Sequence, residues 1–192
     1  MPDEKENVLY HLSVSPHIHA RHSTASIMGE VLLALAPAAL FSVFYFGVRV
    51  LLVIGVSVAS AVLSEWIFQK CTKQTVTVGD LSACVTGLLL AMNLPASIPL
   101  WMAAVGSCFA IIIVKQLFGG IGQNFMNPAL TARCFMLVAW SSAMTNFTVQ
   151  GVSTATPLTL IQTGGELPAL SDCFLGTISG SLGETSALLL LI

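Results

Sequence analysis

The residues best suited to chemistry lie in a hydroxyl-rich stretch, GVSTATPLTL, at positions 151–160 of a largely apolar chain. Thr156 followed by Pro157 is typical of a helix start, because a threonine N-cap accepts an amide hydrogen bond and proline suits the first helical position. That role leaves Ser153 and Thr154 unexplained. Small neighbouring side chains would expose the Thr156 hydroxyl to a modifying enzyme. We therefore expect Thr156 to be a helix cap, an attachment point for a covalent group, or both.

Arg133 is a second candidate, because it lies one to two turns inside an apolar segment. An arginine at the centre of a membrane costs about 2.5–3.5 kcal/mol on insertion scales. We expect its guanidinium to lie near the interface, in an ion pair, or on an anion such as a phosphate. The preceding GGIGQNFMNPA, at 119–129, contains three glycines that can adopt positive φ, followed by the helix-opening pair Asn127 and Pro128. This segment is either a plain loop or the lining of a cofactor or partner site.

Cysteine and histidine show no recognisable metal-binding spacing, so no metal site is predicted. None of the five cysteines lies two to four residues from another, as zinc and iron–sulfur sites usually require. We interpret the cysteines inside apolar runs as buried thiols that pack like small hydrophobic residues. All four histidines lie between positions 11 and 22, in an expected solvated or interfacial arm. The net charge of −2 argues against nucleic-acid binding.

The composition is that of a membrane protein. Hydrophobic residues make up 55% of the chain and charged residues 8%, against about 25% charged residues in soluble domains. A helix needs about 20 apolar residues to cross a bilayer, and continuous apolar runs favour helices over alternating strands. We predict an all-α, polytopic transmembrane bundle with five spans and the start of a sixth. The spans are expected at 28–46, 48–68, 81–94, 98–118 and 127–144, the third being barely long enough.

Charge placement predicts the orientation of the bundle. With a cytoplasmic N-terminus, five basic residues lie on the cytoplasmic side and only Arg49 lies outside. The segment after the fifth span contains no lysine or arginine, which suits an outward-facing loop. The chain then divides into a cytoplasmic arm (1–26), a five-span bundle (27–144), an outward loop (145–180) and a truncated sixth span (181–192). Four acids near span ends are expected to be interfacial rather than part of a cation path: Glu30, Glu65, Asp80 and Glu184.

Four motifs in the same order resemble one family of membrane proteins. STATPL, at 153–158, is similar to a flavinylation site, and LSACVTGLLLAMNLP, GGIGQNFMNPA and GETSALLLL resemble three further stretches of that family. The family comprises the D subunit of Rnf complexes and the B subunit of the Na⁺-translocating NADH:quinone reductase. The resemblance covers most of residues 8–192 and lacks the family's second group of spans, as an N-terminal fragment would. The TATP form and the short arm look more like the Rnf protein.

This resemblance implies that Thr156 carries FMN through a phosphoester, which makes the chain a flavoprotein with a phosphoryl threonine. It implies a subunit of a cell-membrane translocase that relays electrons between ferredoxin and NAD⁺, coupled to outward Na⁺ or H⁺ movement. Implied partners are the other subunits of the complex, a flavin transferase during maturation, and the lipid bilayer. Ser153, Thr154, Arg133 and Asn127 are further candidates for cofactor contacts. The alternatives are the quinone reductase subunit, a cofactor-free transporter or channel, and a structural scaffold.

Overall fold

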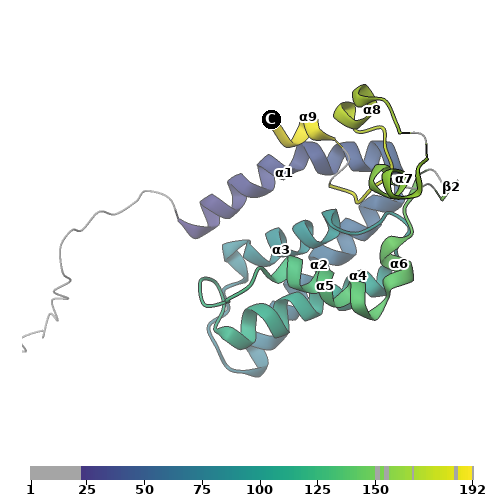
Figure 1. The fold of residues 1–192 in the computed structure, drawn as a ribbon. Helices are drawn as coiled ribbons and strands as arrows, with labels where there is room; N and C mark the ends of the chain where they lie inside the picture. Colours follow the sequence, from purple (N-terminus) through teal and green to yellow (C-terminus); the bar gives the residue numbers. More distant parts are fainter. Residues whose placement is uncertain (1–22, 150–151, 154–155, 166, 184–185, 192) are drawn as a thin grey trace, which may run out of the picture.

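The computed structural model describes residues 23–149, 152–153, 156–165, 167–183 and 186–191 (Figure 1). The helices are α1 (Thr24–Phe46), α2 (Arg49–Cys71), α3 (Ser82–Met92), α4 (Leu100–Phe109), α5 (Pro128–Ala139), α6 (Ser141–Thr145), α7 (Pro157–Thr163), α8 (Leu170–Leu175) and α9 (Ala187–Leu191). Short 3-10 or π-helical turns are η1 (Val78–Asp80), η2 (Ala110–Lys115) and η3 (Gln116–Phe118). In the described residues, strand structure is limited to a two-residue antiparallel pairing of β1 (Thr148–Val149) with β2 (Val152–Ser153). The all-α membrane-bundle prediction is confirmed.

The helices differ in length more than the predicted spans do. Within the described residues, three helical segments are long and apolar enough to cross a membrane: α1, α2, and the continuous segment Leu100–Phe118. Helix α3 has 11 residues and α5 has 12, so each extends only about 16–18 Å, against a hydrocarbon core of about 30 Å. The described residues thus contain three apolar helical segments of membrane length, and shorter apolar helices, α3 and α5, at the predicted third and fifth spans.

The predicted fifth span is too long because its helix breaks at Trp140. This residue has φ −137° and ψ 54°, outside helical geometry, and α6 begins on the other side of it. Neither proline nor glycine occurs at the break, so the sequence carries no ordinary signal for it. Helix α5 consequently ends five residues before the predicted boundary at Met144.

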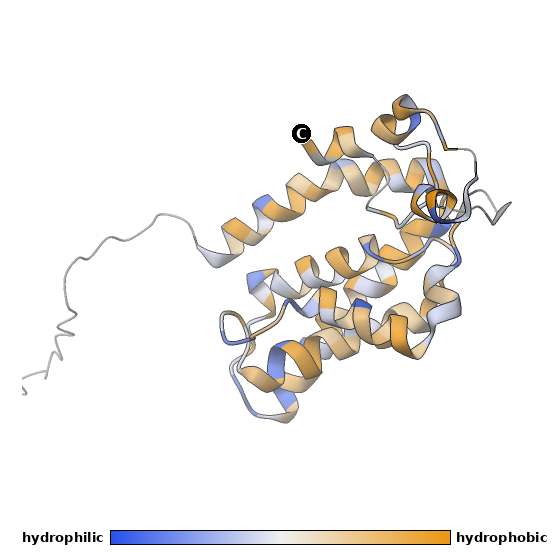
Figure 2. Cartoon of the chain, in the orientation of Figure 1, coloured by the Kyte–Doolittle hydropathy of each residue, from blue (hydrophilic) through white to orange (hydrophobic). Residues whose placement is uncertain are grey.

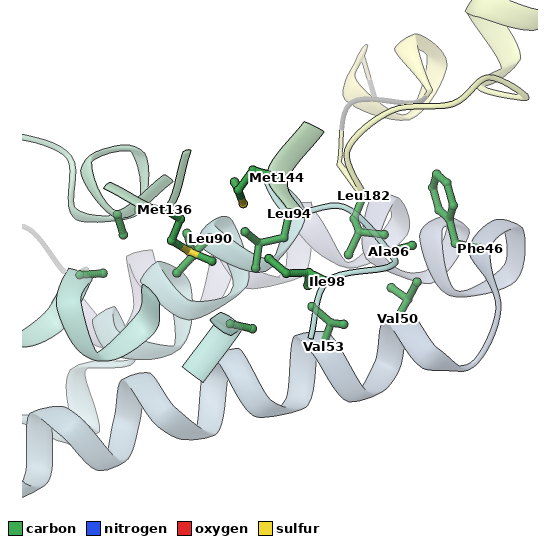
Figure 3. Close-up of a cluster of buried hydrophobic side chains, with 14 residues drawn as sticks. Phe46, Val50, Val53, Leu90, Leu94, Ala96, Ile98, Met136, Met144 and Leu182 are labelled. Carbon is green, nitrogen blue, oxygen red and sulfur yellow. The ribbon is translucent and has the colours of Figure 1, made fainter. Parts of the chain in front are cut away.

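Helix α2 lies at the centre of the bundle and packs against both α3 and α4. The α2–α3 contact is close because Gly87 has no side chain, and a Cβ there would lie 2.8 Å from the Val58 Cα. Apolar side chains from several helices fill the core, as Figure 3 shows for Val53, Leu90 and Met136 among others. Small residues at this helix crossing are what membrane bundles use for close approach.

The outer surface of the bundle is apolar. Figure 2 shows hydrophobic residues along all the long helices, and on α1 the side chains of Leu40 and Phe44 are 70% and 89% exposed. Large exposed apolar side chains on membrane-length helices are those expected to face lipid or neighbouring subunits. The elements from β1 to α8 gather beyond one end of α3, α4 and α5 (Figure 1).

The segment at 179–183, just before α9, is buried in the bundle. The Leu182 amide donates to the Leu94 carbonyl at 3.1 Å, and the Gly183 amide donates to the Met92 carbonyl at 2.7 Å. The Ser42 hydroxyl on α1 donates to the Leu182 carbonyl. The irregular backbone of this buried segment is thus hydrogen-bonded to neighbouring segments, as it must be away from water. These bonds tie the chain before α9 to the C-terminal end of α3.

Candidate functional site

Thr156 is the N-cap of α7, as the sequence predicts. Its hydroxyl accepts a hydrogen bond from the Thr159 amide at 3.3 Å, and the two threonine hydroxyls lie 2.8 Å apart. Pro157 occupies the first turn, where its missing amide hydrogen leaves no helical bond unmade. The cap accounts for the position of the Thr156 side chain and leaves it only partly buried.

Thr156 and Arg133 line the same cavity, of about 410 Å³. The other lining residues are Phe147, Pro157, Leu158, Ile178, Ser179, Gly180 and Ser181. Cofactor pockets typically measure about 300–1,000 Å³ and combine apolar walls with a few polar groups. Two residues singled out separately in the sequence thus meet at one site of cofactor size.

Arg133 is held by a residue that the sequence does not single out. Its Nη1 donates to Asn93 Oδ1 at 2.6 Å, and Asn93 Nδ2 donates to the Leu89 carbonyl at 2.8 Å. Asn93 caps the C-terminal end of α3. Because the asparagine is neutral, this contact does not itself compensate the guanidinium charge. The two residues lie 40 positions apart in the sequence, so no local sequence pattern predicts the contact.

The other predicted cofactor contacts do not join this cavity in the described part of the chain. Asn127 is the N-cap of α5 and accepts from the Ala129 and Leu130 amides at 3.0 and 3.3 Å, as predicted. It lines a different cavity of about 200 Å³, together with Lys115. Ser153 belongs to β2, with its side chain outside the described structure, and Thr154 lies outside the described residues.

A second polar cluster is buried between α2 and the end of the fourth predicted span. Lys115 Nζ lies 2.8 and 2.9 Å from the two carboxylate oxygens of Glu65, and the side chains are 4% and 1% exposed. Glu65 is therefore buried within the protein and ion-paired, and its expected place near the membrane interface stays a prediction. The π-helical turn η2 ends at Lys115. Such a turn rotates the following side chains relative to a regular α-helix and often occurs at functional sites.

Hydrogen bonds extend this cluster in two directions. Gln116 Nε2 donates to Glu65 Oε1 at 2.7 Å, so the carboxylate has an amide donor besides Lys115. Lys115 also donates to the Ser82 hydroxyl at 2.5 Å, and that hydroxyl donates to Asp80 Oδ1 at 2.5 Å. A cavity of about 460 Å³ adjoins the cluster and is lined by Glu65, Asp80 and Gln116 among others. Burying a charge pair costs desolvation free energy, so such a pair is expected where hydrogen bonds satisfy both groups or where the pair has a function.

The cysteines differ from their prediction. All five are free thiols: Cys71 and Cys134 are exposed, and Cys84, Cys108 and Cys173 are partly buried. The buried-thiol interpretation is therefore wrong for Cys134, which is exposed on α5, and holds only in part for Cys84 and Cys108. In the described residues, no three histidine, cysteine or acidic side chains gather as a metal-binding group. The four histidines lie outside the described residues.

The described residues contain three membrane-length apolar helices with a charge pair buried among them, which defines a multi-pass membrane protein. Residues 11–192 match the family described as the NQR2, RnfD, RnfE family, and the chain belongs to that family. The matched region includes α1 to α8, and with them both polar sites.

Named relatives are D subunits of ion-translocating complexes. The chain is 50% identical to the D subunit of the Na⁺-translocating ferredoxin:NAD⁺ oxidoreductase complex of Acetobacterium woodii, over 94% of this chain and 59% of the relative. It is 42% identical to the D subunit of the proton-translocating ferredoxin:NAD⁺ oxidoreductase complex of Clostridium ljungdahlii, over 98% of this chain and 61% of the relative. The D subunit of the ion-translocating oxidoreductase complex of Tolumonas auensis is 38% identical, over 79% and 44% respectively. The chain thus spans about three fifths of the length of the first two relatives.

Proposed function

We propose that this chain forms part of the D subunit of an ion-translocating ferredoxin:NAD⁺ oxidoreductase complex and carries FMN covalently on Thr156. Membership of the family and the names of its relatives support the subunit assignment. The observation that carries the flavin assignment is that Thr156 and Arg133 open onto one cavity of about 410 Å³. The electron-transfer activity is that of the whole complex, to which this chain contributes one site.

The cavity lining suits a flavin phosphate. It offers a hydroxyl for a phosphoester at Thr156, a guanidinium for the phosphoryl oxygens at Arg133, and apolar side chains such as Leu158 and Ile178 for an aromatic ring. When bound, FMN supplies one- and two-electron transfer, and the protein supplies position and electrostatics. Thr156 acts as an anchor in this scheme. Arg133 would hold the phosphoryl group and offset its negative charge.

The wider assignment follows the family resemblance. The protein would lie in the cell membrane with its N-terminus cytoplasmic and the 145–180 loop outside, and it would contact the other membrane and peripheral redox subunits. A flavin transferase would attach FMN during maturation. Ferredoxin and NAD⁺ would bind other subunits, because this sequence contains neither a cluster-binding cysteine pattern nor a dinucleotide fingerprint on a strand. The assembly would act as an oxidoreductase coupled to Na⁺ or H⁺ movement.

Mass spectrometry of the purified protein tests the flavin assignment. In cells that express the transferase, the peptide containing Thr156 should gain the mass of FMN minus water, and the denatured band should fluoresce under ultraviolet light. Thr156→Val should remove both signals. Thr159→Val is the matched control, because that hydroxyl lies 2.8 Å from the first and belongs to the same turn. An unmodified Thr156 peptide in the native complex would refute the assignment, and a cytosolic reporter within 145–180 would refute the orientation.

A cofactor-free ion transporter is the second candidate function. The buried Glu65–Lys115 pair and the adjoining cavity of about 460 Å³ favour it, because ionisable groups inside membranes commonly line ion pathways. It predicts ion movement in a chain without covalent flavin. Reconstituted Thr156→Val complex that still pumps ions during turnover would support this candidate over the flavin carrier. The third possibility, a quinone reductase subunit, predicts quinone-dependent rather than ferredoxin-dependent turnover.

A further inference from the structure

We propose that Ser97, in the loop between α3 and α4, is a positioning residue that holds the Phe147 wall of the cavity around Thr156 and so limits the access of water to a flavin bound there. This inference rests on the proposed flavin site and adds to it the residue that keeps one wall of the cavity in place. The cavity is the one of about 410 Å³ that Phe147 and Thr156 both line.

Ser97 joins the start of the flavin loop to the helical bundle. Its hydroxyl donates to the Asn146 carbonyl at 2.9 Å, between residues 49 positions apart in the sequence. Asn146 ends α6 with φ −87° and ψ 95°, so the chain leaves the helix at this residue. Phe147 follows directly and lines the cavity. The bond therefore restrains the backbone from which the Phe147 side chain projects.

Ser97 is itself held in place by the bundle. Arg49 Nη2 donates to the carbonyl oxygens of Ser97 and Ile98 at 3.2 and 3.4 Å. The neighbours of Ser97 in the chain, Ala96 and Ile98, are 7% and 1% exposed and belong to the main core. Closely packed core side chains leave the backbone that carries them little room to shift. Ser97 thus offers the flavin loop a fixed hydrogen-bond partner.

A second wall of the cavity is held by the same part of the chain. Ser179 and Ser181 line the cavity, and the backbone that follows them is hydrogen-bonded to the carbonyls of Met92 and Leu94. Residues 92–97 therefore bind both the segment that carries the serine wall and the segment that carries the aromatic wall. The separation of these two walls depends on one short, well-packed stretch of chain.

The consequence for a bound flavin is its exposure to water. Exclusion of water from a reaction site strengthens the electrostatic interactions within it and prevents side reactions. The chemistry belongs to the cofactor, and the protein controls its position and surroundings. Without the Ser97 hydroxyl, the Phe147 wall would open more often, and the flavin would meet the solvent more often.

Two measurements on the assembled complex test the proposal: hydrogen exchange of the backbone amides at 146–149, and iodide quenching of the covalent flavin fluorescence. Loss of one net hydrogen bond corresponds to about 2- to 10-fold in the population of an opened loop. In Ser97→Ala we expect the amides at 146–149 to exchange about 2- to 10-fold faster and the iodide quenching constant to rise at least about 2-fold. Ser97→Thr keeps the hydroxyl and should restore the wild-type values of both.

The two measurements separate positioning from a structural role. A merely structural bond predicts faster exchange at 146–149 in Ser97→Ala with unchanged iodide quenching, whereas the proposal predicts that both change together. Thr145→Val is the matched control, because the Thr145 hydroxyl also donates to a backbone carbonyl at 2.9 Å, one residue from Asn146, but that bond stays within α6. It should leave the iodide quenching constant at the wild-type value.

Several results would overturn the inference. These are unchanged exchange or unchanged iodide quenching in Ser97→Ala, and a Ser97→Thr complex that behaves like Ser97→Ala. A Ser97→Ala complex that fails to assemble or lacks covalent FMN would assign Ser97 to folding or maturation, and would also overturn it. An unmodified Thr156 peptide in the wild-type complex is a different result, because it refutes the flavin carrier itself. Covalent FMN in the wild type with unchanged quenching in Ser97→Ala rejects Ser97 alone and leaves the carrier intact.

Discussion

Removing one member of the Glu65–Lys115 pair should destabilise the bundle more than removing both. Each single change leaves a charge buried without its partner, which typically costs about 3–5 kcal/mol of unfolding free energy. Lys115→Met leaves Glu65 with the Gln116 amide at 2.7 Å and the Gln69 amide at 3.3 Å, so we expect a loss of about 3 kcal/mol. Glu65→Met leaves the ammonium with the Ser82 hydroxyl and removes the acceptor of the Gln116 amide, while the Gln69 amide keeps the Thr77 hydroxyl, so we expect about 5 kcal/mol.

The double variant Glu65→Met/Lys115→Met removes both charges and replaces them with side chains of similar length. Because the desolvation cost of the pair disappears with it, the double variant should be less destabilised than the Glu65→Met single variant. Unfolding of the purified protein in detergent, followed by helical circular dichroism, measures all three. Lys70→Met controls for loss of a lysine charge on α2, since Lys70 is exposed, and it should change stability by less than about 0.5 kcal/mol. A double variant that loses the sum of the two single effects would refute the pairing.

Three further variants test packing and capping. Gly87→Ala should cost about 1–3 kcal/mol, because its Cβ would lie 2.8 Å from the Val58 Cα; thermal unfolding measures this, and an unchanged midpoint would contradict the α2–α3 contact. Leu182→Ala should lower the free energy of unfolding by about 2–5 kcal/mol, since the side chain is 1% exposed and packs in the main core. Proteolytic cleavage of the chain beyond residue 176 should also become faster. The control Leu191→Ala, which changes an exposed side chain, should alter neither the stability nor the cleavage rate. Thr156→Val should remove the N-cap hydrogen bond of α7 and lower the stability of that helix by about 1 kcal/mol, whereas Thr156→Ser should keep the bond. Hydrogen exchange of the α7 backbone amides distinguishes the two variants, and equal exchange rates would argue against the cap.

The features that the sequence predicted correctly are determined by short stretches of chain. Asn127 before Pro128 and Thr156 before Pro157 specify their helix starts within four residues, and both caps are confirmed. Continuous apolar runs likewise predicted the helical class. In each case the determining interaction is between residues close in sequence, so the sequence pattern is enough to predict the structure.

The features that the sequence missed depend on contacts between distant residues. Glu65 and Lys115 are 50 residues apart, and Asn93 and Arg133 are 40 residues apart. Composition could suggest that Arg133 needs a partner, but only the packing of α3 against α5 selects Asn93. The helix break at Trp140 has the same origin, because no proline or glycine accompanies it. Burial of a charged residue is a property of the whole bundle and cannot be read from one span.

Helix α3 connects the two polar centres of the protein. Its first residue, Ser82, accepts a hydrogen bond from Lys115, and the residue that caps its other end, Asn93, holds Arg133. Eleven helical residues form a rod of about 17 Å, which is too stiff and too short to absorb movement along its axis. A rigid displacement of α3 would therefore move Ser82 and Asn93 together, and would change the contacts of Lys115 and of Arg133 at the same time.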